Sequence, residues 1–121
     1  MGMYTELLIK CMVRENLAPE VQGILDYLFL DKEKPKMLPN HDFFLASNWD
    51  LIGRCNSYYH IPMTINYYKD RYLFSRSDIK NYGNEIGLFL GWFNPYIDTE
   101  EKCIGWRWYE EDIFPTLIYK K

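Results

Sequence analysis

The hydrophobic pattern changes its period early in the chain, and this change restricts the fold more than any other feature. Between residues 4 and 14, one set of residues recurs at every second position, which predicts a β-strand with one face on a core. Pro19 and Glu20 suit the first turn of a helix, and apolar residues follow at helical spacing up to Phe29. The inward-facing residues of the strand are Thr5, Leu7, Ile9, Cys11 and Val13.

The middle of the chain holds a long connection and two further strand-like segments. Residues 35–50 contain two prolines and three aromatic residues, so we expect this connection to pack back on the domain. Residues 51–59 and 66–77 each read as a strand, and Pro62 lies between them. Together these two segments predict a hairpin with a long tip.

The last third of the chain predicts a second helix and two more strands. Asn81 or Asn84 caps a helix with an apolar stripe that Pro95 ends. In the strand at 103–110, alternation places Ile104, Trp106 and Trp108 on one side, and a short strand closes the chain at 115–120.

The order β-α-β-β-α-β-β predicts a single α+β domain over residues 1–121, of ferredoxin-like type. Two helices would cover one face of an antiparallel sheet, and the other face would be open unless a partner covers it.

Charge and composition exclude several classes of protein. The net charge is −3, from 14 basic and 17 acidic residues, so the broad positive surface of a duplex-DNA binder is not expected. No apolar run approaches the roughly 20 residues that span a bilayer, and no signal peptide is recognisable. Three scattered cysteines indicate free thiols in a reducing compartment. We therefore expect a cytoplasmic protein without membrane contact.

The motifs that carry chemistry are missing from the sequence. No glycine-rich phosphate loop and no closely spaced pair of metal ligands occurs, and the two histidines, His41 and His60, are far apart. Cys55 has Arg54 beside it, but alternation places the two side chains on opposite faces. We expect no metal, no cofactor and no catalytic residue, and the sequence favours a non-enzymatic protein over an enzyme.

Aromatic and arginine side chains form the strongest functional signal. Aromatic residues make up 18% of the chain, including 11 Tyr and 4 Trp. Tyr, Trp and Arg dominate the energetics of protein interfaces. The candidate binding residues are Trp49, Arg54, Tyr58, Tyr59, His60, Tyr72, Arg76, Trp106 and Trp108. They predict a protein-interaction module that binds a protein partner or a second copy of itself as a homodimer.

Two other functions stay open at this point. A small molecule or nucleotide could occupy a pocket between the 35–50 loop, with His41, Asp42 and Trp49, and the segment bearing Arg54 and His60. Single-stranded nucleic acid could stack on the aromatic strands, although no RNP-like segment supports this.

Several short motifs resemble those of a known group of proteins. They are Ser57-Tyr58-Tyr59, Asn81 to Ile86, Phe89-Leu90, Trp92, Pro95-Tyr96-Ile97, and the tail from Tyr109-Glu110-Glu111 to Pro115-Thr116-Leu117-Ile118-Tyr119. In these motifs the chain resembles small proteins of unassigned function encoded by phages, prophages and mobile elements of bacteria. The resemblance implies no substrate and no catalytic residue, but it implies an accessory protein that acts inside a bacterial host.

Overall fold

A computed structural model describes residues 3–55 and 64–121 of the chain, and these residues form an α+β fold. Its helices and strands, in chain order, are β1 (Thr5–Met12), α1 (Pro19–Leu30), β2 (Ile65–Lys69), β3 (Tyr72–Ile79), α2 (Glu85–Phe93), β4 (Cys103–Tyr109) and β5 (Thr116–Tyr119). Short 3₁₀ turns lie at Asp42–Leu45, Trp49–Leu51 and Asn94–Tyr96. The predicted α+β class, with an antiparallel sheet and two helices, is confirmed.

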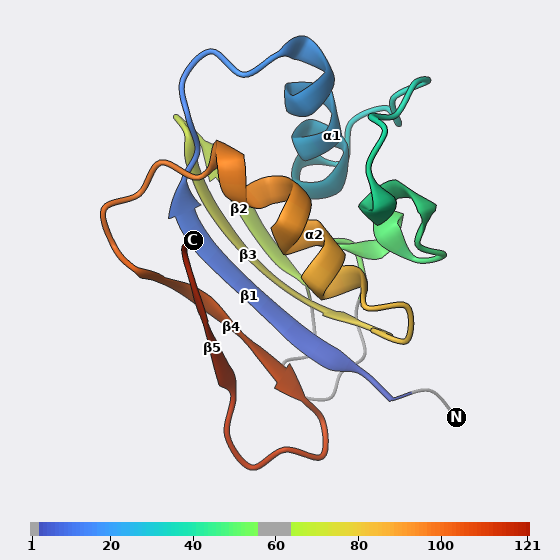
Figure 1. The fold of residues 1–121 in the computed structure, drawn as a ribbon, viewed down its shortest axis with the longest axis vertical. Coiled ribbons are helices and arrows are strands. Elements are labelled where there is room, and N and C mark those ends of the chain that lie inside the picture. The colour runs from blue at the N-terminus through green and yellow to red at the C-terminus, as the bar shows by residue number, and fades with distance from the viewer. Residues whose placement is uncertain (1–2, 56–63) are drawn as a thin grey trace.

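The five strands form one antiparallel sheet in the order β2-β3-β1-β4-β5. Figure 1 shows α1 and α2 lying over the same face of this sheet, while β4 and β5 extend away from the helices. The hydrophobic core fills the space between the helices and the sheet. On the sheet side it contains Leu7, Ile9 and Cys11 of β1, the central strand.

Both helices begin and end close to where the sequence predicts. Pro19 occupies the first turn of α1, and Asp31 closes the helix in the left-handed conformation. At the start of α2, the side chain of Asn81 accepts a hydrogen bond from the Ile86 N–H, although Asn84 is the residue at the cap. Of the two asparagines that the sequence offers as a cap, Asn84 occupies the cap position without a side-chain hydrogen bond, and Asn81 supplies one.

The segment before β2 differs from its prediction. Residues 49–51 form a 3₁₀ turn and residues 52–54 a further turn, so the predicted strand from residue 51 is wrong as far as Cys55. Gly53 has a φ of 74°, a left-handed conformation that breaks an extended strand. Residues 56–59, the rest of that prediction, lie outside the described residues.

The predicted strand at 66–77 is two strands with a tight turn between them. Asp70 and Arg71 form this turn with φ values of 51° and 70°, as a two-residue hairpin turn with positive φ at both positions requires. The sequence does not indicate this turn, because Asn-Gly or Asp-Gly, the usual signal of a two-residue hairpin turn, is absent. The order of elements still agrees with the prediction, since this hairpin supplies the strand that residues 51–55 do not.

A β-bulge in β4 changes which side chains share a face. The register of β4 against β5 shifts between Cys103 and Gly105, and Gly105 has a φ of 154°. Ile104 consequently lies in the core, whereas Trp106 is only half-buried. The prediction that Ile104 shares a face with the two tryptophans is therefore wrong.

Candidate functional site

Within residues 3–55 and 64–121, one face of the sheet carries no helix (Figure 1), and we call it the helix-free face. Residues directly opposite each other on neighbouring strands share a face of the sheet. Leu8 lies opposite both Arg76 and Trp106, and Trp106 lies opposite Leu117, so these residues point away from the helices. The apolar side chains of the helix-free face are Leu8, Met12, Ile65, Tyr67, Tyr72, Phe74, Trp106, Trp108, Leu117 and Tyr119.

Exposure on the helix-free face is greatest at its two sides. Tyr67 and Tyr72 are exposed at the β2–β3 side, where their ring centroids are 6.1 Å apart. Leu117 and Tyr119 are exposed at the β5 side. The tryptophans between them are half-buried. Large apolar side chains thus lie on this face in all five strands, although Glu6, Arg76 and Asp78 in its middle are shielded from solvent.

A cluster of buried charges lies on the same side of the sheet. Arg76 Nη2 is 2.8 Å from Glu6 Oε1 and 3.5 Å from Asp78 Oδ1. Trp106 donates its indole N–H to Glu6 Oε2 over 2.6 Å. All three charged side chains are buried. This network fixes the orientation of the Trp106 ring, because a buried carboxylate is strongly stabilised by the donors that surround it.

The structure places some sequence-predicted binding residues together and separates others. Tyr72, Trp106 and Trp108 lie on the helix-free face, and the Trp108 indole N–H donates to the Asp112 carbonyl oxygen. Arg76 belongs to the same face but is only 1% exposed, so its guanidinium holds the charge cluster and is not presented to solvent. Tyr58, Tyr59 and His60 lie outside the described residues.

Trp49 belongs to the core. Its ring contacts those of Phe43 and Phe44 at centroid distances of 5.8 Å and 5.1 Å, beneath Tyr27 at 6.0 Å. The 35–50 connection therefore packs on the domain through aromatic side chains, as its composition predicts. Because Trp49 is buried there, it cannot form the wall of an open pocket with Arg54.

Arg54 lines a groove beside the end of α1. The groove has a volume of about 560 Å³, and Asp31, Thr64 and Asn66 also line it. The guanidinium of Arg54 is already engaged: it donates to the Tyr27 carbonyl oxygen, lies 3.1 Å from Asp31 Oδ1 and stacks 4.4 Å from the Tyr27 ring. His41, Asp42 and Trp49 do not line this groove, and His60, the other residue of the predicted pocket, lies outside the described residues.

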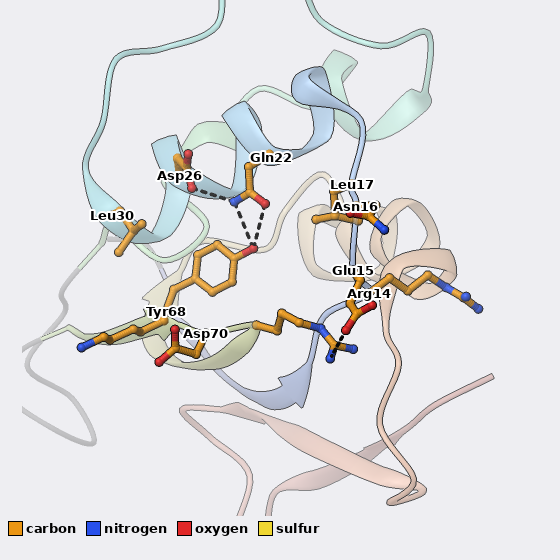
Figure 2. A pocket seen from close by; sticks show the side chains of 11 residues that line it. Arg14, Glu15, Asn16, Leu17, Gln22, Asp26, Leu30, Tyr68 and Asp70 are labelled. Atoms are coloured by element: carbon orange, nitrogen blue, oxygen red, sulfur yellow. Dashed lines mark hydrogen bonds and ion pairs between the residues drawn. The ribbon is translucent and has the colours of Figure 1, made fainter.

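A second hollow, of about 440 Å³, lies between α1 and the tip of the β2–β3 hairpin, and the sequence did not predict it. Figure 2 shows the Tyr68 hydroxyl reaching Gln22, which in turn donates to Asp26. Arg71 closes one end, where it pairs with Glu15 and with Asp98 outside the hollow. Acidic and basic side chains line this hollow in equal number, so it favours no charged ligand.

The thiols and titratable groups do not form a reactive site in the described residues. Burial raises the pKa of the Cys11 thiol to about 12, and burial together with the charge of Asp78 raises that of Cys55. Both shifts disfavour the thiolate that a cysteine nucleophile needs. Across residues 3–55 and 64–121, no group of three or more His, Cys, Asp or Glu side chains is arranged to hold a metal ion.

Comparison with protein-family models, with curated proteins and with solved structures finds no match. Among the described helices, none has the length and apolar character needed to cross a bilayer. Seven of the apolar residues of the helix-free face were not assigned from the sequence, although their alternation in the strands was a signal for them. They are Leu8, Met12, Ile65, Tyr67, Phe74, Leu117 and Tyr119.

Proposed function

We propose that this protein is a non-enzymatic interaction module whose helix-free face binds a protein partner. The observation that carries the proposal is the exposure of Tyr67 and Tyr72 at one side of that face and of Leu117 and Tyr119 at the other. Exposed apolar side chains gain free energy when a partner removes them from water.

The composition and rigidity of the face support this function. Tyr and Trp are enriched at the centres of protein interfaces, where they bury large areas with few rotatable bonds. Trp106 is held in one orientation by its hydrogen bond to Glu6. A side chain that is fixed before binding loses less conformational entropy in the complex.

We further propose that the first six elements form a ferredoxin-like arrangement to which β5 adds a strand. In its support, β3 lies between β1 and β2, and β4 pairs with the other side of β1, as two interleaved β-α-β units would require. The resemblance to mobile-element proteins suggests the setting: an accessory protein that acts on a host factor inside a bacterium.

The function is tested by capture from bacterial lysate with three immobilised proteins. The face variant Tyr67→Lys/Tyr72→Lys places two charges on the helix-free face. The control Met37→Lys/Leu45→Lys adds the same charge at exposed apolar positions outside the sheet. We expect the unmodified protein and the control to retain the same host protein and the face variant to lose it. Equal retention by all three proteins would contradict a role for this face.

The groove beside Arg54 supports a second candidate function, the binding of a small anionic molecule or nucleotide. Its volume of about 560 Å³ is within the range of ligand pockets. A ligand there would have to replace Asp31 as the partner of the Arg54 guanidinium. Thermal unfolding with and without nucleoside phosphates tests this function, because a ligand that binds the folded state raises the midpoint. An unchanged midpoint at saturating nucleotide would exclude it.

A further inference from the structure

The strand β5 forms one edge of the sheet, and its outer side has no strand neighbour in the described part of the chain. The Lys120 N–H donates to the Lys102 carbonyl oxygen over 2.7 Å, so the backbone groups of Lys120 point toward β4. Backbone groups of successive residues in an antiparallel strand point to opposite sides. Leu117 and Tyr119 therefore direct both their N–H and their C=O groups to the free edge.

Exposed apolar side chains accompany this free edge. Leu117 is 48% and Tyr119 57% exposed, and in the turn that precedes β5, Ile113 is 82% and Phe114 77% exposed. An edge strand with free backbone groups and apolar side chains is a template for pairing with another strand.

We propose that β5 pairs antiparallel with β5 of a second copy, with Ile118 opposite Ile118 of that copy. Leu117 of each copy then lies opposite Tyr119 of the other. Each such pair exchanges two backbone hydrogen bonds, so the edge-facing groups of both residues are satisfied on both copies. The same register places the exposed Leu117 side chain beside the exposed Tyr119 ring, a favourable cross-strand contact.

Other registers fit less well. A shift by one residue would place Leu117 opposite a residue whose side chain points to the helix side. A register centred on Leu117 would place Tyr119 opposite Pro115, which has no N–H to donate. The carbonyl oxygen of Tyr119 would then stay without a hydrogen bond.

The charges that flank β5 favour a second copy in the antiparallel direction. Glu110, Glu111 and Asp112 precede the strand, and Lys120 and Lys121 follow it. Antiparallel pairing brings the basic end of each strand toward the acidic turn of the other copy, whereas parallel pairing would bring like charges together. A second copy of the chain has both this order of charges and a free β5 edge.

A hollow of about 220 Å³ lies between β5 and α2, on the helix side of this edge, and Gly91, Asn94 and Lys121 line part of it. A Cβ atom at Gly91 would have no atom within 4 Å, so the hollow is open above this residue. In the proposed register, Thr116 and Pro115 of the second copy lie opposite Lys120 and Lys121. The hollow therefore lies directly beside the proposed contact.

The dimer goes beyond the proposed function, because it follows from β5 and does not depend on a host partner. Since its two-fold axis is perpendicular to the sheet, the helix-free faces of both copies lie on the same side of one continuous sheet. A strand of four residues is only about 14 Å long. This contact is smaller than a standard interface of roughly 800 Å² per partner, so we expect a dimer that dissociates on dilution.

Sedimentation equilibrium over a wide range of protein concentration tests the dimer. Leu117→Pro removes an N–H that points to the free edge but none that points to β4, and Tyr119→Lys places a charge beside the pairing partner. Tyr67→Lys adds the same charge at the opposite side of the same face and is the control. Far-UV circular dichroism checks that each variant is folded.

We expect a dimer fraction that rises with concentration for the unmodified protein and for Tyr67→Lys. Leu117→Pro and Tyr119→Lys should raise the dissociation constant more than about tenfold, since each removes contacts from both copies. A monomer at every concentration, or a dimer that both β5 variants leave unchanged, would overturn the proposal. The capture experiment changes only Tyr67 and Tyr72, on the opposite side of the sheet from β5, so the two proposals fail separately.

Discussion

At the scale of single residues, two glycines show how differently the same residue type acts in this fold. A Cβ atom at Gly105 would lie 1.8 Å from the Leu8 carbonyl oxygen, and the residue has a φ of 154°. Gly105 is therefore required by the close approach of β4 to β1 at the bulge. Gly91 lies in α2 with open space above it, so no contact requires a glycine there.

Substitution by alanine should separate these two roles. Gly105→Ala forces the backbone of β4 away from Leu8 and should lower the free energy of unfolding by more than about 3 kcal/mol. Gly91→Ala should raise it by about 0.5–1 kcal/mol, because alanine loses less backbone entropy in a helix. Urea denaturation of both variants measures these changes. A similar effect of the two substitutions would contradict the placement of the bulge.

The buried charge cluster gives a second prediction for one residue. Arg76→Leu leaves the carboxylates of Glu6 and Asp78 without the guanidinium that stands between them. We expect a loss of about 3–5 kcal/mol in the free energy of unfolding, measured in urea. Arg14→Leu, which removes an exposed guanidinium, is the control. It should lower the free energy of unfolding by less than about 1 kcal/mol. If both substitutions cost the same, the cluster does not stabilise the sheet.

The third residue-scale prediction concerns pH and Cys11. Burial raises the pKa of its thiol from 9.0 to about 12, so the folded state keeps a proton that the unfolded state loses. The stabilising contribution is complete below pH 9 and declines as the pH rises toward 12. Between pH 8 and pH 10, the free energy of unfolding of the unmodified protein should fall by about 1.4 kcal/mol more than that of Cys11→Ala. Equal losses in the two proteins, measured by urea denaturation, would mean that the thiol is not buried.

At the scale of elements, the sequence predicted the strands and helices in which a regular hydrophobic pattern extends over many residues. β1 and both helices have such patterns, and their faces agree with the structure. The β2–β3 hairpin was missed because Asp70 and Arg71 adopt left-handed conformations that ordinary propensities do not favour. Arg71 is held there by contacts distant in sequence: its Nε donates to the Val13 carbonyl oxygen, and its guanidinium pairs with Glu15 and Asp98.

Two substitutions at Arg71 separate the turn conformation from these contacts. Arg71→Gly and Arg71→Ala both remove the side-chain contacts, but only glycine adopts the left-handed conformation without steric cost. We expect the glycine variant to be more stable than the alanine variant by about 1 kcal/mol in urea denaturation. A more stable alanine variant would show that the turn does not have positive φ at this position.

At the scale of the whole molecule, the covering of one sheet face by both helices was predictable, but the residues on the other face were not. The order of elements indicates that two helices cover one face only. Which aromatic residues lie on the other face depends on strand register and on the bulge at Gly105, and neither is readable from local sequence. Trp49 and Arg76 illustrate the difficulty, because both have the chemistry of interface residues and both are buried.

The most direct test of the account is site-specific photocrosslinking in bacterial cells. A photoreactive amino acid replaces Tyr72 on the helix-free face in one protein and Leu45, an exposed residue outside the sheet, in the other. If the helix-free face binds a protein, irradiation should give a discrete crosslinked product from position 72 and none from position 45. No product from position 72, or the same products from both positions, would contradict the claim that this face is the interaction surface.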